Sequence, residues 1–148
     1  MNKILSFIVN DDKKFLLLKG SPSDPQFKKS FWYVVTGGCE KEDSTKKDTV
    51  IREIEEETGI SELDNIIYLN WIFKYNSLGE KCTEYAYITF VKNTKVKLNK
   101  ENIDYKWCDL DEFIDQIYWF GDKKQLRKVL ELAINKQIYF KNEKTETF

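Results

Sequence analysis

The residues best suited to do chemistry are the acids of one short segment, residues 52–60. A helix turns by about 100° per residue, which places Glu53, Glu56 and Glu57 on one face of a helix. Carboxylates at this spacing repel one another, and they lie toward the helix C-terminus, where the helix dipole disfavours anions. The pattern therefore predicts either a solvated acidic face or a bound cation that compensates the repulsion.

A hard divalent cation compensates such a cluster well. Mg²⁺ and Mn²⁺ prefer carboxylate oxygens and water in octahedral array, and they commonly bridge a protein to phosphate groups. The chain contains no histidine, which excludes histidine-containing zinc sites, Ser-His-Asp triads and Cys-His pairs. Any acid–base chemistry must therefore use carboxylates, lysine, tyrosine or a metal-bound water.

Composition narrows the class of protein further. The 148 residues are expected to form one domain, residues 1–148. A net charge of -1 argues against a general nucleic-acid binder, and no apolar run approaches the roughly 18 residues of a membrane helix. The three cysteines are expected to be reduced, and without an export signal we expect a cytoplasmic protein. A homodimer is left open.

The elements that must position the acidic helix alternate between strands and helices. Apolar and β-branched stretches predict strands at 4–9, 15–19, 31–36, 65–75, 83–91 and 105–108. The first two of these are expected to form a hairpin, and Gly37 and Gly38 to end the third. This interleaving predicts a mixed α/β domain, with residues 141–148 as a frayed tail.

Three helices are expected between and after these strands. The acidic helix is predicted to start at an N-cap on Ser44 or Thr45 and to stop at Gly59. Its apolar face, Val50, Ile51 and Ile54, is expected to dock on the sheet. A short helix at 113–118 is capped by Asp109 or Asp111, and a final helix starts at Asp122 with an apolar stripe of Leu126, Val129, Leu130, Ala133 and Ile134.

Residues 38–60 resemble a known motif. Gly38 followed by residues 52–60 is similar to the Nudix box of the Nudix hydrolases, G-x5-E-x7-R-E-U-x-E-E-x-G-U, where U is aliphatic. The fixed positions that match are Gly38, Arg52, Glu53, Glu56, Glu57 and Gly59, and Ile54 and Ile60 fill the aliphatic positions. So many matches arise by chance about once in 10⁷ starting points. The resemblance implies the α/β/α sandwich of that family, with a mixed sheet.

One fixed position departs from the motif. The first glutamate of the box is Ser44 in this chain, and in the family that glutamate helps to order the loop and the metal shell. Because serine is a good N-cap, the helix itself is not expected to suffer. The departure instead raises the question of how many metal ions the site holds.

The resemblance also implies roles for individual residues. Glu53, Glu56 and Glu57, with the Gly38 carbonyl, would bind Mg²⁺ or Mn²⁺, and a metal-activated water would attack phosphorus. Arg52 is expected to pair with a carboxylate such as Glu56 and to hold the ligands in place. Arg52, Glu53 and Glu56 are thus assigned to catalysis.

Two further phrases resemble particular members of the family. Residues 31–38, FWYVVTGG, and residues 101–107, ENIDYKW, are similar to segments of bacterial dihydroneopterin triphosphate and dATP pyrophosphohydrolases, with Asn102 in place of a histidine. The candidate substrate-binding residues are Lys19 for phosphate, Trp32 for stacking on a base, and Tyr75, which lies close to a tyrosine position of those enzymes. Packing is the alternative role for the aromatic pair, and a solvated side chain the alternative for Lys19.

Glu101 is the predicted catalytic residue outside the box. The resembling motif uses an equivalent glutamate as a further metal ligand or as the general base. Since the chain lacks histidine, a carboxylate beside the metal is also the simplest base for the attacking water. An ordinary exposed acid is the alternative, and Asp104 is the natural control.

The sequence thus predicts a Mg²⁺-dependent Nudix pyrophosphohydrolase that acts on a nucleoside-triphosphate-like substrate, a nucleoside diphosphate linked to another group. A diadenosine polyphosphate hydrolase is the alternative among enzymes. A catalytically weak nucleotide-binding module is the alternative from another class.

Overall fold

The computed structural model describes residues 1–21, 30–92 and 95–141. Within these ranges the strands are β1 (Asn2–Val9), β2 (Phe15–Gly20), β3 (Trp32–Tyr33), β4 (Val35–Gly38), β5 (Leu63–Ser77), β6 (Glu80–Val91) and β7 (Asn102–Cys108). The helices are α1 (Lys46–Thr58), α2 (Leu110–Gln116) and α3 (Lys123–Ile134). No helix in the described ranges is long and apolar enough to cross a membrane.

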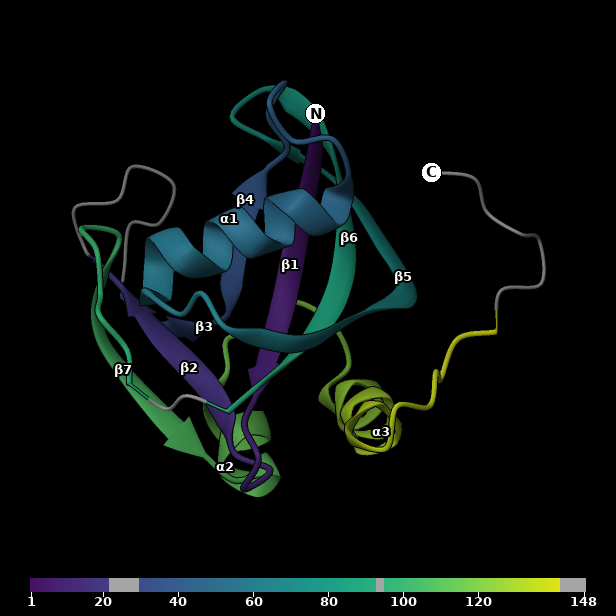
Figure 1. The fold of residues 1–148 in the computed structure, drawn as a ribbon. Helices are drawn as coiled ribbons and strands as arrows, with labels where there is room; N and C mark the ends of the chain where they lie inside the picture. The colour runs from purple at the N-terminus through teal and green to yellow at the C-terminus, as the bar shows by residue number, and fades with distance from the viewer. Residues whose placement is uncertain (22–29, 93–94, 142–148) are drawn as a thin grey trace.

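The described strands form one mixed sheet with β1 at its centre. β1 pairs parallel with β6 along its whole length, from Asn2 opposite Thr83 to Val9 opposite Phe90. The other pairings are antiparallel: β5 with β6, β4 with β1, and β3 and β7 with β2. The sheet lies between α1 on one face and α2 and α3 on the other (Figure 1).

Alternation along β1 explains the three layers. Ile4 and Ile8 pack with Val50 and Ile54 of α1, whereas Leu5, Phe7 and Val9 belong to the cluster under α2 and α3. Successive side chains of a strand point to opposite faces, so an apolar run such as 4–9 predicts a strand covered on both sides. The predicted α/β sandwich with a mixed sheet is confirmed.

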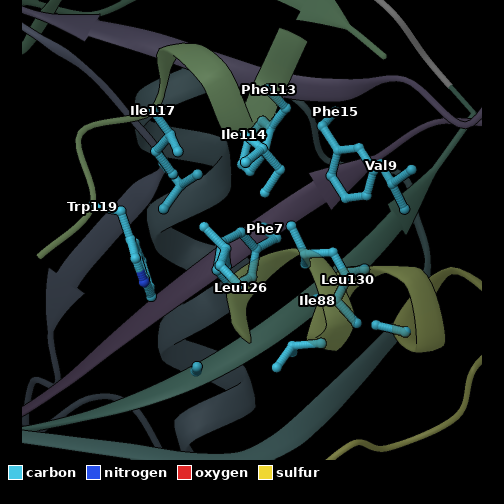
Figure 2. Packing of buried hydrophobic residues seen from close by; sticks show 14 of the residues in the cluster. Phe7, Val9, Phe15, Ile88, Phe113, Ile114, Ile117, Trp119, Leu126 and Leu130 are labelled. Atoms are coloured by element: carbon cyan, nitrogen blue, oxygen red, sulfur yellow. The ribbon is translucent and has the colours of Figure 1, made fainter. Parts of the chain in front are cut away.

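The larger core lies under α2 and α3 (Figure 2). Phe113 of α2 packs on Phe15 and edge-on against Phe7, with ring centroids 5.1 and 6.1 Å apart. The α3 stripe is buried as predicted at Leu126, Val129, Leu130 and Ala133. This cluster contains most of the buried aromatic surface of the described chain.

Two strand predictions need correction. β1 and β2 are antiparallel neighbours only at Val9 and Phe15, because β4 occupies the edge of β1 from Lys3 to Ser6. The strand predicted at 31–36 is divided into β3 and β4, and it continues through Gly37 and Gly38 instead of ending there. Both glycines stay in the strand because their neighbours on β1 pair with them.

Helix boundaries follow local signals more closely. The N-cap of α1 is Thr45, not Ser44, and Thr45 and Asp48 form a reciprocal capping box. Gly59 ends the helix in the left-handed region with φ +73°, as predicted. The docking face was wrong at one position: Ile51 is 41% exposed.

Two other predictions concern the ends of elements and the tail. α2 is capped by Asp109 and begins at Leu110, earlier than predicted. The predicted tail, apart from Lys141, and most of the predicted loop at 21–25 fall outside the described residues.

Candidate active site

Arg52 of α1 connects the main parts of the candidate site. Its Nη2 donates to the Gly38 carbonyl oxygen and its Nη1 to Glu53 Oε2, each at 2.9 Å. The predicted pairing with Glu56 is present but longer, at 3.4 Å. Arg52 therefore joins β4 to the acidic face of α1, and its planar fork fixes the spacing between the two.

The strongest partner of Arg52 is Asp43, a residue that the sequence analysis missed. Arg52 donates to both Asp43 oxygens, from Nε at 3.1 Å and from Nη2 at 2.9 Å. Thr49 Oγ1 and the Glu40 backbone N–H also donate to Asp43 Oδ2, each at 2.9 Å. The Arg52 guanidinium and these further donors hold the pKa of Asp43 well below its usual range.

Asp43 lies directly before Ser44, the position at which the box glutamate is missing, and Ser44 itself is exposed. The acid needed to hold Arg52 is thus supplied one residue earlier. The nearby acidic residue was the available signal, but its use depends on the path of the loop before α1.

Glu53 and Glu57 form a buried acidic pair. They are 8% and 6% exposed, respectively, and their carboxyl groups are close enough for a hydrogen bond between them when one is protonated. Burial raises the pKa of both, with Glu56 adding to the effect at Glu53 and Glu101 and Glu53 adding at Glu57. Within the described chain, Glu57 Oε2 is buried with no hydrogen-bond partner.

Gly37 makes room for Glu53. A Cβ at this position would overlap the Glu53 side chain, which lies directly over the glycine. The close approach explains a glycine in the middle of β4 at a position that the box motif does not include. Glu53 is therefore held between Gly37 below it and Arg52 beside it.

Glu101 faces the pair from the other side of a cavity of about 310 Å³. The cavity is lined by Glu53, Glu57, Glu101 and Asn102, among others. Asn102 Nδ2 donates to Glu57 Oε1 at 3.4 Å, and Asn99 Nδ2 donates to Glu101 Oε2 at 3.0 Å. The segment before β7 and the helix α1, far apart in sequence, thus bring their acids to one cavity.

The remaining predicted site residues are spread more widely. Gly38 lines the cavity of the acids, whereas Glu56 is exposed on α1 and is absent from the described lining. Tyr75 lines a second, neighbouring cavity. Lys19 and Trp32 belong to neither described lining; they pack on each other, with the ammonium 5.7 Å from the ring centroid.

The donor set fits a hard divalent cation in part. A buried carboxylate oxygen without a partner and a second carboxylate beside it are the ligands that Mg²⁺ prefers. However, no three acids of the described residues are grouped closely enough to enclose a metal ion. Glu56 contacts Arg52 and Glu101 contacts Asn99, so a cation would recruit further ligands by side-chain movement or from water.

A mixed sheet between helical layers, with acids from one helix facing a cavity, is the arrangement of a phosphate-processing α/β domain. The NUDIX domain family model matches residues 2–129, and the chain belongs to this family. The prediction of a Nudix enzyme is confirmed at this level. No protein of curated function matches the chain in sequence.

Solved structures share the fold at low identity. A MutT protein from Methanosarcina mazei is 22% identical with a TM-score of 0.70, covering 93% of this chain and 96% of its own. The E. coli dihydroneopterin triphosphate pyrophosphohydrolase is 20% identical with a TM-score of 0.68, covering 88% and 94%. A C. elegans Ap4A hydrolase is 20% identical with a TM-score of 0.71, covering 90% and 98%. These likenesses concern the fold alone.

Proposed function

We propose that the chain is a Mg²⁺- or Mn²⁺-dependent hydrolase that cleaves a phosphoanhydride bond in a nucleoside-triphosphate-like substrate. The observation that carries the proposal is the buried pair of Glu53 and Glu57, which faces a cavity and leaves Glu57 Oε2 without a donor. Two adjacent buried acids must be neutralised by a proton or a cation. Triphosphate substrates commonly bring such a cation with them.

Each residue has a defined task in this proposal. When bound, the divalent cation would neutralise phosphate oxygens and lower the pKa of a coordinated water. Glu53 and Glu57 would hold it, with the Gly38 carbonyl as a further ligand and Glu56 joining from the exposed side of α1. Arg52 fixes the distance between Gly38 and Glu53 through its two 2.9 Å hydrogen bonds.

Glu101 is proposed as the general base. It lies on the opposite side of the cavity from Glu57, and its negative charge acts on that carboxyl group. A carboxylate held by Asn99, and not by the metal ligands themselves, can accept a proton from water as the water attacks phosphorus.

A Mg²⁺ titration with two variants tests the proposal. Wild-type protein should unfold at a higher temperature with added Mg²⁺ and should release phosphate or pyrophosphate from nucleoside triphosphates. Glu57→Gln keeps the side-chain shape but removes a ligand, so turnover should fall by about 100-fold or more and the Mg²⁺-dependent stabilisation should shrink. Glu55→Gln, on the exposed side of α1, is the matched control and should do little.

Two results would contradict the proposal. Wild-type protein whose melting temperature and nucleotide turnover both ignore Mg²⁺ would not be a metal-dependent hydrolase. Equal losses in Glu57→Gln and Glu55→Gln would mean that the two positions do not differ as their burial suggests.

The finer substrate assignment rests on the two resembling phrases, residues 31–38 and 101–107. They favour a pterin or purine deoxynucleoside triphosphate over a diadenosine polyphosphate. Comparable fold similarity to enzymes of both kinds does not discriminate between them. A phosphate- and pyrophosphate-release screen over nucleoside triphosphates, dinucleoside polyphosphates and dihydroneopterin triphosphate is the direct test.

One observation favours a second candidate, a nucleotide-binding module with weak turnover. No three acids of the described residues are grouped as a metal cluster, and Ser44 replaces an acid of the box motif. For such a module, a nucleoside triphosphate would raise the melting temperature in the presence of Mg²⁺ and remain intact. Product analysis after the same titration separates the two functions.

A further inference from the structure

A second cavity opens beside the one that holds the acids. It has a volume of about 550 Å³, within the range of small-molecule sites. Lys3, Phe31, Tyr33 and Thr36 line both cavities, so the two adjoin. A ligand with its phosphates near Glu53 and Glu57 would therefore extend the rest of its structure into this second space.

The walls of the second cavity are aromatic. Phe31 and Tyr118 stack with ring centroids 4.3 Å apart, and Phe73 and Phe120 meet edge-on at 4.9 Å. Tyr118 and Phe120 are each 57% exposed, which is unusual for rings of this size. Exposed rings gathered at a cavity are typical of a surface that binds a planar ligand.

The chain segment between α2 and α3 holds these two rings in place. Ile117 and Trp119 alternate with Tyr118 and Phe120 and point into the core (Figure 2). The Tyr118 backbone N–H also donates to the Trp32 carbonyl at 2.9 Å. The exposed rings are thus fixed from behind by buried neighbours, so they form a preformed wall.

One acid, Glu84, belongs to the described lining of this aromatic cavity. It is 4% exposed and lies on β6, directly opposite Lys3 on β1 and Phe73 on β5. The Tyr75 hydroxyl donates a hydrogen bond to its carboxylate. Burial raises the pKa of Glu84 to about 7, against the charge of Lys3 and the Tyr75 hydrogen bond.

We propose that this cavity binds the heterocycle of the substrate and that Glu84 recognises two adjacent N–H donors on it. An ionised carboxylate only accepts hydrogen bonds, and its two oxygens match a ring N–H beside an exocyclic amino group. The 2-amino-4-oxo ring edge shared by guanine and pterins presents this pair. Adenine presents an acceptor beside a donor, which leaves one buried oxygen facing a lone pair.

This inference rests on the proposed function only for the position of the phosphates. It can be tested with ligands that have no phosphoanhydride bond, so hydrolysis is not required. Calorimetric titrations with GMP, IMP and AMP at about pH 8.5, where Glu84 is ionised, compare the ring edges. IMP differs from GMP only by the missing 2-amino group. We expect GMP to bind about tenfold or more tightly than either of the others.

Variants assign the preference to Glu84. Glu84→Gln replaces one acceptor with a donor at nearly constant shape, and it should bring GMP and IMP to about equal affinity while the protein stays folded. Tyr75→Phe removes the hydroxyl that orients the carboxylate and should reduce the preference by about two- to threefold. Glu80→Gln changes an exposed acid on the same strand and should leave the preference intact.

The outcomes separate this inference from the proposed activity. Equal affinities of wild-type protein for GMP, IMP and AMP, or an unchanged preference in Glu84→Gln, would overturn it and leave Glu84 as a structural partner of Lys3. A GMP preference in a protein that hydrolyses no triphosphate would support it while the proposed function fails. A parallel titration with guanosine and neopterin distinguishes the two sources of the ring edge, and tighter binding of either supports the inference.

Discussion

The helices on one face of the sheet, α2 and α3, bury apolar side chains, whereas α1 on the other face buries two glutamates and two threonines beside Val50 and Ile54. Apolar burial stabilises the fold by about 25 cal/mol per Å². Burial of an acid opposes folding unless a partner compensates it. The comparison indicates that the α2/α3 face supplies stability to a site on the α1 face that consumes some of it.

The largest effect is expected at the site, and it should leave stability unchanged. Glu101→Gln should lower kcat by about 10²–10⁴-fold, because a lost general base has this range of effect. The residue is exposed, so the melting temperature should not change. Steady-state kinetics at saturating Mg²⁺ make the measurement, with Asp104→Asn as the control. Full turnover in Glu101→Gln would move the base to Glu53 or Glu56.

The converse effect is expected on the opposite face. Leu130 of α3 is fully buried in the aromatic core, so Leu130→Ala should lower the free energy of unfolding by about 2–5 kcal/mol. Turnover per folded molecule should be unchanged below the unfolding transition. Denaturant titration gives the first quantity and kinetics the second. A large fall in turnover of the folded variant would show that the two faces are not separate in function.

Glu84 tests the comparison at its exception, a buried acid on the apolar face. Burial raises its pKa from 4.5 to about 7, so the unfolded chain ionises first as the pH rises and the folded state loses stability between these values. Glu84→Gln should therefore gain up to about 3 kcal/mol relative to wild type from pH 4.5 to pH 7. Lys3, Tyr75 and Tyr33 are the titratable groups that act on it.

Denaturant melts of wild type and Glu84→Gln at several pH values measure this difference. A stability difference that stays flat across the window would mean that water reaches the carboxylate in the folded protein. It would also weaken the case for an ion that reads a bound ring.

The smallest effect is expected at Asp43, which supports the site indirectly. Asp43→Asn should weaken the hold on Arg52 and lower Mg²⁺ affinity or turnover by about 10–100-fold, as for other outer-shell partners of metal ligands. Ser44→Glu in the same chain should recover part of the loss if an acid at either position can hold Arg52. Mg²⁺-dependent melting shifts check this, and Ser44→Ala should stay near wild type.

Local signals in the sequence predicted α1 well. Gly59 and the Thr45 alternative gave its ends, and residue spacing put Glu53 and Glu57 on one face while Glu55 faced solvent. The same spacing misplaced Ile51, because apolarity alone does not fix how far a helix is rotated on its sheet. Thr58 is buried instead, where its hydroxyl donates to the Ile54 carbonyl at 2.6 Å.

Long-range features were beyond a single sequence. The use of Asp43 in place of Ser44 depends on a loop path, and the fit of Glu53 over Gly37 depends on how α1 crosses β4. Glu84 was not predicted because its neighbours come from cross-strand register, with Lys3 and Phe73 far away in sequence. The pairing of Lys19 with Trp32 has the same origin.

The parallel pairing of β1 with β6 also has a consequence for the order of folding. β1 is buried from Ile4 to Val9, and its parallel partner spans Glu80–Val91. During synthesis, the most apolar strand of the sheet therefore emerges first and waits for its partner until more than half of the chain has been made. Non-local pairing of this kind slows folding, and an exposed apolar strand in the meantime favours aggregation. Truncations that end before β6 should accordingly be insoluble.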